Sequence, residues 1–531
     1  MHPRARRKLI IGVVVALLAV AAVALYFTVF RKESKPEKGI ASVEKQTISV
    51  NGVDLAAEII TPRGVAHPPL LVMPGSFRGS AASYHPLSLL FGRAGYQVVA
   101  YGQRGFGGST GKVDFAGPAT QRDAREVITW ALEHTNADPK RIAMLGTSYG
   151  AGISLLTAAH DSRVRAVAAL STWTDFADAY LDSGTPHILP LRSVLGGTSN
   201  ASDYDPELRH LQSTLLDHPA DLPTVLHAMS AVRSPDTYVK QLNANNPAIM
   251  IANAFQDSYF QPAQLISFVD QLKTPKRLEL GPGDHGGPER SSLEGVPNEI
   301  IDDVLAWFAH YLRGADNGIQ HEDPIVAKDS RTGELRALRS WPVPTKKQCA
   351  PLDKPGVLDS TGVPTNTWVA TIPAGTDSGA DAAPIQLVQS PSYRPAKVKL
   401  NTLAPDTTFT WTGPELANGL ELVGTPSLTI NLASSSPTAT LYLYLYDVSP
   451  DGTGTLIDLQ AYTATGLNPS DATHLSIPMQ PMAWSVPSGN HVALVVDTAD
   501  PRFLSLTPPN TTITVTSSKK RSAAFCAPTA D

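Results

Sequence analysis

The sequence predicts an α/β domain built on a mainly parallel sheet, followed by an all-β sandwich. Strand and helix signals alternate over residues 39–175, which is typical of a parallel sheet covered by helices. The last helix of this α/β region is predicted at residues 298–313, where the sequence is strongly amphipathic, and Gly314 ends it. Beyond about residue 322 the pattern is β throughout, and residues 440–446 alternate with a period of two. Such a tail favours a β-sandwich.

The first region contains short apolar runs of strand length. A helix is predicted over Gln121–Thr135, because its apolar residues fall on one helical face. The strand candidates are Leu55–Ile60, Leu70–Met73, Tyr96–Ala100, Ile142–Leu145, Val164–Leu170, Ala248–Phe255 and Arg277–Leu280.

Residues 173–245 interrupt the alternation with a proline-rich, irregular helical pattern, which indicates an inserted cap. We therefore expect three segments. These are an N-terminal segment (1–38), an α/β domain (39–320) carrying the cap, and a β-sandwich (321–531).

The N-terminus carries a localisation signal. Four basic residues, Arg4, Arg6, Arg7 and Lys8, precede Leu9–Phe30, which holds no charge. About 20 apolar residues cross a bilayer as a helix, and a basic flank favours a cytoplasmic N-terminus. We expect a single-pass membrane anchor with the rest of the chain outside the cytoplasm. The alternative is a cleaved signal peptide and a secreted protein.

Charge and cysteine content exclude some partners. Residues 1–38 hold eight of the 43 Lys and Arg but two of the 48 Asp and Glu, so the remainder has a net charge of −11. Nucleic acid is therefore not an expected partner.

Cys349 and Cys526 either form a disulfide in an oxidising compartment or stay as free buried thiols. Neither lies near a histidine cluster, so no metal site is predicted, and no cofactor is expected.

The segment 141–152 has the layout of a nucleophile elbow, in which a serine sits on a tight strand-to-helix turn. An apolar run leads into Gly146-Thr147-Ser148-Tyr149-Gly150, and a helical pattern follows. A second match, Gly107-Gly108-Ser109-Thr110-Gly111, lies in a glycine-rich stretch that starts no helix. Context therefore favours Ser148 as the nucleophile.

A serine nucleophile needs a base and a third group that orients the base. In the α/β-hydrolase fold the acid and the histidine follow the serine in the chain, on loops after later strands. Asp257 closes the strand at 248–255, and His285 follows the next strand. Asp284 competes with Asp257 for the acid role, but it could merely cap a turn. We predict the triad Ser148, Asp257 and His285.

An oxyanion hole needs two preorganised N–H donors. One is expected from Tyr149, directly after the nucleophile. The other is expected from the turn after Leu70–Met73, with Ser76 as first choice and Phe77 as second.

These motifs together resemble the X-Pro dipeptidyl-peptidase and cocaine-esterase family of α/β-hydrolases. The resemblance runs from about residue 45 to 520. It implies a helical cap over the site, a C-terminal jelly-roll domain, and hydrolysis of esters or amides through an acyl-enzyme. Two departures stand out: Gly102 replaces an aspartate usual in the family, and no tyrosine follows the early strand at residues 74–79. The matching motifs are residues 146–150, 104–109, 255–257, 281–286, 422–426 and 445–452.

Three functions remain open from the sequence. The first is a serine hydrolase acting on a small-molecule ester, and the second is an X-Pro dipeptidyl-peptidase acting on a short peptide. The third is an inert cell-surface binding protein, which the intact order of Ser148, Asp257 and His285 argues against.

Overall fold

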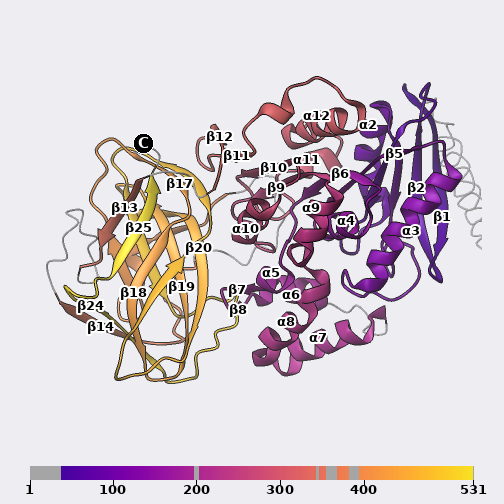
Figure 1. Ribbon diagram of the computed structural model, residues 1–531. Coiled ribbons are helices and arrows are strands. Elements are labelled where there is room, and N and C mark those ends of the chain that lie inside the picture. Colours follow the sequence, from indigo (N-terminus) through magenta and orange to yellow (C-terminus); the bar gives the residue numbers. More distant parts are fainter. Residues whose placement is uncertain (1–37, 197–202, 342–345, 354–366, 382–393, 530–531) are drawn as a thin grey trace, which may run out of the picture.

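A computed structural model describes residues 38–196, 203–341, 346–353, 367–381 and 394–529 (Figure 1). The α/β part lies on one side of the molecule and the β-rich part on the other, with most of the cap helices below the first (Figure 1).

The first part contains a ten-stranded sheet in the order β1-β2-β4-β3-β5-β6-β9-β10-β11-β12. Its central strands, β4 to β11, pair in parallel, as the alternating pattern predicted. The strand bounds are Ile40–Val50 (β1), Val53–Pro62 (β2), Pro69–Pro74 (β3), Gln97–Tyr101 (β4), Asp138–Thr147 (β5), Val164–Leu170 (β6), Ala248–Ala254 (β9), Lys276–Gly281 (β10), Ile325–Lys328 (β11) and Leu335–Leu338 (β12).

Helices cover both faces of this sheet, because the central strands are apolar on both sides. One buried cluster joins one sheet face to Val127, Leu155 and Phe268, which lie on α3 (Pro118–His134), α4 (Tyr149–His160) and α10 (Ala263–Gln271). A second joins the other face to Phe91 and Phe308, on α2 (His85–Arg93) and α12 (Glu299–Arg313). The predicted stop of α12 is present, since Gly314 adopts a left-handed conformation with φ 67°.

The cap leaves the sheet after β6 and returns at β9. Its elements are α5 (Phe176–Tyr180), β7 (Leu181–Asp182), β8 (Thr185–Pro186), α6 (Ile188–Leu195), α7 (Pro206–Asp217), η3 (Pro219–Asp221), α8 (Leu222–Arg233), η4 (Pro235–Tyr238) and α9 (Val239–Asn245). Aromatic and aliphatic cap residues share one buried cluster with Tyr149 of α4, so the cap packs directly over the helix that follows the nucleophile elbow.

The second part is built of two antiparallel sheets that enclose an apolar core, as predicted. One has the order β14-β24-β18-β25-β17-β22, with β13 and β21 paired beside it, and the other the order β15-β20-β19-β23-β16. The bounds are Lys346–Pro351 (β13), Trp368–Pro373 (β14), Lys397–Lys399 (β15), Phe409–Thr412 (β16), Leu420–Gly424 (β17), Ser427–Ser434 (β18), Thr438–Val448 (β19), Thr453–Thr465 (β20), Thr473–Pro478 (β21), Met482–Val486 (β22), His491–Asp497 (β23), Thr512–Ser517 (β24) and Ala524–Thr529 (β25).

The two cysteines form a disulfide. Cys349 on β13 and Cys526 on β25 face each other across an antiparallel pair. The bond ties the first strand of the β-rich part to its last one. Strands β11 and β12, which follow residue 320, extend the first sheet, and the segment boundary at 320/321 stays a prediction.

The expected membrane localisation needs correction. Within the described ranges, which begin at residue 38, no helix is long and apolar enough to cross a bilayer. The stretch Leu9–Phe30, on which the expectation of an anchor rested, lies outside those ranges. We therefore withdraw both the single-pass anchor and the membrane partner.

Candidate active site

The turn between β5 and α4 has the geometry of a nucleophile elbow. Ser148 adopts φ 57° and ψ −119°, in the left-handed half of backbone space that L-residues rarely occupy. A Cβ at Gly146 would lie 2.2 Å from the carbonyl carbon of Gly150, and one at Gly150 would lie 2.1 Å from the Pro74 carbonyl oxygen. The turn therefore requires glycine at both positions, because any side chain would collide with the backbone.

The three residues predicted as a triad come together at the edge of the sheet where the parallel strands end. His285 Nε2 lies 2.8 Å from Ser148 Oγ, and its Nδ1 lies 3.0 Å from both Asp257 carboxylate oxygens. Asp257 also accepts the amide protons of Tyr259 (2.9 Å) and Phe260 (2.8 Å). With the His285 Nδ1–H directed at a carboxylate, Nε2 is free to accept the Ser148 proton.

Two opposing effects act on the imidazole. Burial alone would lower the pKa of His285, but the Asp257 carboxylate, with smaller contributions from Glu289 and Asp284, raises it above its ordinary value. The ring is also held in place, because Tyr259 stacks on it at 4.5 Å and Phe260 meets it edge-on at 4.9 Å. A basic and fixed imidazole is what a general base requires.

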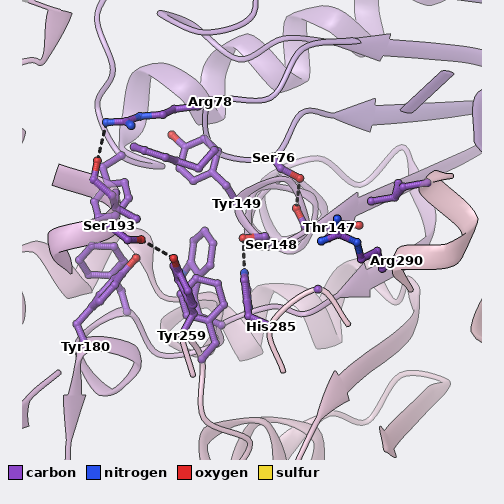
Figure 2. A pocket seen from close by; sticks show the side chains of 18 of the residues that line it. Ser76, Arg78, Thr147, Ser148, Tyr149, Tyr180, Ser193, Tyr259, His285 and Arg290 are labelled. Carbon is purple, nitrogen blue, oxygen red and sulfur yellow. Dashed lines mark hydrogen bonds between the residues drawn. The ribbon is translucent and has the colours of Figure 1, made fainter. Parts of the chain in front are cut away.

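Hydrogen bonds hold the elbow from the side of the early strand. The Tyr84 hydroxyl accepts the Thr147 N–H at 2.9 Å. Ser76 Oγ donates to the Thr147 carbonyl at 2.9 Å (Figure 2). Ser76, Phe77 and Tyr149 all line the cavity that holds Ser148. The Tyr149 amide belongs to the first turn of α4, where N–H groups have no partner within the helix. The choice of Tyr149 and Ser76 as oxyanion donors stays a prediction.

The cavity around Ser148 and His285 has a volume of about 440 Å³. Figure 2 shows Tyr180 and Tyr259 on one side of Ser148 and Arg290 on the other. Aromatic side chains dominate its lining: Phe77, Phe115, Tyr149, Trp173, Phe176, Tyr180, Tyr259 and Phe260.

The cap helix α6 reaches the cavity through Ser193 and Val194. The Ser193 hydroxyl is hydrogen-bonded to the Tyr259 hydroxyl, and Arg78 donates to the Val194 carbonyl at 3.0 Å (Figure 2). The cap is therefore hydrogen-bonded both to the loop between β9 and α10, which carries Asp257, and to the turn after β3.

The second serine motif has a structural role. Ser109 Oγ donates to the Gly102 carbonyl at 2.8 Å and accepts the Ala56 N–H at 2.9 Å. A Cβ at Gly102 would lie 3.0 Å from the Phe106 carbonyl oxygen and 3.1 Å from Ser109 Oγ, so an aspartate there would be crowded. Arg104 instead pairs with Asp123 of α3.

Sequence reasoning missed Ser171 and Glu289 beside the triad, and it considered Asp284 without identifying its partner. Asp284, considered as the acid, accepts the Ser258 N–H at 2.8 Å and so joins the two loops that carry Asp257 and His285. Ser171 and Glu289 lie on the other side of the His285 loop. Ser171 directly follows β6, which is the neighbour of β5, the strand that ends at Thr147 just before Ser148. This place at the end of a central strand was the available sequence signal. Over the described part of the chain, no group of three or more His, Cys, Asp or Glu is placed to hold a metal ion.

This geometry defines an α/β-hydrolase with a serine, histidine and aspartate arranged as a triad. Residues 51–287 match the family model of the X-Pro dipeptidyl-peptidase (S15 family), and residues 317–530 match that of the X-Pro dipeptidyl-peptidase C-terminal non-catalytic domain. The chain belongs to this family, as its motifs indicated.

Curated relatives match over part of their length. A serine esterase of Mycobacterium bovis is 26% identical over 41% of this chain and 36% of its own, and an Xaa-Pro dipeptidyl-peptidase of Rhodopirellula baltica is 26% identical over 39% and 30%. The match thus spans about a third of each relative.

Solved structures share the fold over nearly the whole chain. An α-amino acid ester hydrolase aligns with a TM-score of 0.71 at 14% identity, covering 94% of this chain and 99% of its own. A CocE/NonD family hydrolase of Staphylococcus aureus aligns with a TM-score of 0.70 at 13% identity, covering 92% and 93%.

Proposed function

We propose that the protein is a serine hydrolase that cleaves carboxylic esters through an acyl-enzyme, with Ser148 as nucleophile, His285 as general base and acid, and Asp257 as the group that orients His285. The contact of 2.8 Å between Ser148 Oγ and His285 Nε2, with Asp257 on the opposite ring nitrogen, carries this proposal.

The reaction follows from these contacts. Ser148 Oγ bonds to the carbonyl carbon while its proton passes to His285 Nε2. The protonated imidazole then gives this proton to the leaving alcohol as the ester bond breaks, which leaves an acyl group on Ser148. In the second step a water molecule gives a proton to His285 Nε2 as its oxygen bonds to the acyl carbon. The imidazolium then returns this proton to Ser148 Oγ as the bond between Oγ and the acyl carbon breaks, which releases the acid and free Ser148. The N–H groups of Tyr149 and Ser76 would bind the oxyanion in both steps.

The charges around the cavity favour an ester over an X-Pro peptide. A dipeptidyl-peptidase must hold the protonated amine of its substrate, which calls for a carboxylate in the cavity. Among the described residues that line the cavity, Glu294 is the single acidic residue. Its carboxylate is already paired with Arg290, with 3.1 Å between Oε1 and the arginine Nε. Arg78 and Arg290 both line the cavity, so its charge disfavours a cationic substrate.

The acidic residues of the cap serve the fold instead. Asp175 accepts the amide protons of Ala177 and Asp178 and caps α5, and Asp205 caps α7. Asp182 is buried against glutamines of the β-rich part. None of these described aspartates lines the cavity. X-Pro dipeptide release stays the second candidate, since the name of one relative supports it.

Labelling with a fluorophosphonate tests the nucleophile. We expect stoichiometric labelling of the protein and none of Ser148→Ala. Ser109→Ala, which alters the serine of the second motif, is the matched control and should be labelled at the rate of the parent. Equal labelling of Ser148→Ala would refute the assignment of the nucleophile, and absence of labelling in all three proteins would support the binding-protein alternative.

Parallel assays on p-nitrophenyl esters and on an X-Pro anilide separate the two hydrolase candidates. We expect a higher kcat/KM for the esters. A preference for the anilide would reverse the order proposed here.

A further inference from the structure

A buried carboxyl group lies behind the His285 loop. Glu289 is fully buried, and its Oε2 accepts the hydroxyl proton of Ser171 at 3.0 Å. The same Ser171 oxygen accepts the N–H of Gly286 at 3.0 Å, and Gly286 directly follows the histidine. The backbone N–H of Gly286 can only donate, so Ser171 Oγ is the acceptor of that hydrogen bond. The single hydroxyl proton of Ser171 is then donated to Glu289.

The backbone at Ser171 is unusual for a serine. It has φ 49°, in the left-handed region, and its N–H donates to the Ala252 carbonyl at 2.7 Å. Such strain persists where the surrounding contacts hold it, and it turns the hydroxyl toward the His285 loop. On the other side of the histidine, Asp284 binds the Ser258 N–H. The loop is thus held at the residue before His285 and at the residue after it.

Glu289 also acts on the charge of the site. Its Oε1 has no hydrogen-bond partner among the described residues, so nothing on that oxygen offsets the loss of water. Burial raises the pKa of Glu289 to about 7, and the carboxylate form in turn favours protonated His285. The groups that face His285 are Asp257 and Asp284 on their loops, Ser148 on the elbow, the Tyr259 and Phe260 rings, and Glu289.

We propose that Glu289 is a positioning residue of the hydrolase: through Ser171 it fixes the backbone next to His285, and as a carboxylate it stabilises the imidazolium that forms when Ser148 gives up its proton. This inference rests on the proposed function of the triad. It adds Glu289 to Asp257 and Asp284, the two carboxyl groups that the sequence places beside the histidine.

The variant Glu289→Gln separates charge from shape. Its amide oxygen still accepts the Ser171 hydroxyl, but the side chain carries no charge. We expect the pKa of His285, followed by ¹³C NMR of labelled histidine, to fall by about 0.5 to 1 unit. His285→Gln identifies the signal. Because the base acts in its neutral form, the acid limb of kcat/KM should shift to lower pH by the same amount, while the plateau of kcat falls roughly tenfold.

Glu279→Gln is the matched control. Glu279 lies on β10 and is a buried carboxyl whose pKa burial raises to about 8, but its partner is Arg277 and it does not act on His285. We expect this variant to lose stability without moving the His285 titration. A second variant, Ser171→Gly, removes the hydroxyl but tolerates the left-handed backbone. It should lower kcat with little change in KM.

An unchanged His285 titration in folded Glu289→Gln would overturn the proposal, even if kcat fell, because a purely structural residue would give that result. A shift of equal size in Glu279→Gln would also overturn it. The NMR titration needs no turnover, so failure of Ser148 labelling and failure of this inference are separate results.

Discussion

At the level of single residues, the site depends on a small number of steric and electrostatic requirements. Gly146 and Gly150 flank Ser148 because any side chain there would collide with backbone. The Asp257 carboxylate accepts hydrogen bonds from two backbone N–H groups and from the Asn253 side-chain amide, in addition to the one from His285. Its carboxylate is therefore fixed before the reaction begins, and little reorganisation is needed when the imidazole becomes charged.

The pH dependence of the hydrolase follows from His285. In the proposed mechanism His285 is the base and must be neutral in the free enzyme, so kcat/KM should fall as pH drops through the pKa of His285. Because the neighbouring carboxylates raise that pKa, we expect the midpoint of the acid limb above about 6.5, the ordinary value for histidine. A profile of kcat/KM on a p-nitrophenyl ester from pH 5 to 9 measures it. A midpoint at or below 6 would mean that burial outweighs Asp257.

At the level of elements, strand ends made most of the site predictable. The apolar runs at 142–145, 248–255 and 277–280 became β5, β9 and β10, and their carboxyl ends bring Ser148, Asp257 and His285 together. Strand β1 was not predicted, because it is an edge strand on which most side chains are exposed and few apolar residues mark a face.

The supporting residues could not be predicted in the same way. Glu289 lies in an irregular segment beside Arg290, and glutamate is rarely buried, so sequence pattern gives no reason to place it inside. Ser171 follows a predicted strand, but a lone serine there carries no sign that its backbone is left-handed. Contacts of this kind depend on tertiary packing and not on periodicity.

Helix α3 is joined to the glycine-rich loop after β4 by a buried ion pair. Arg104 binds Asp123 through two contacts, of 2.7 and 2.8 Å, and the Asn51 amide adds a third at 3.0 Å. In Asp123→Asn the guanidinium loses its charged partner inside the protein, which should cost about 3 kcal/mol of unfolding free energy. Urea unfolding measures the loss. Glu299→Gln removes an exposed partner of Lys328 and should change stability by less than about 0.5 kcal/mol. Similar effects of the two changes would contradict the account.

At the level of the whole molecule, the β-rich part supports the cap, although it contributes no residue to the triad. The Leu189 N–H donates to the Arg502 carbonyl at 3.0 Å, and the Leu504 N–H donates to the Pro186 carbonyl at 2.8 Å. The Phe503 ring stacks on His187 at 4.3 Å. These contacts secure the start of α6, the cap helix whose Ser193 and Val194 line the cavity. The cavity wall therefore depends on both parts of the chain.

Loss of the Phe503 ring should affect substrate binding more than chemistry. Phe503 is buried, and Phe503→Ala would leave His187, the residue just before α6, without its stacking partner. Ser148, Asp257 and His285 come from elements that Phe503 does not contact through this ring pair. We expect KM for a p-nitrophenyl ester to rise about fivefold with kcat changed less than twofold, and stability to fall by about 3 kcal/mol. Phe525→Ala, at an equally buried ring on β25, controls for the loss of stability alone and should leave KM unchanged. If both variants raise KM alike, instability of the β-rich part explains the effect; if Phe503→Ala leaves KM unchanged, the cavity does not depend on this contact.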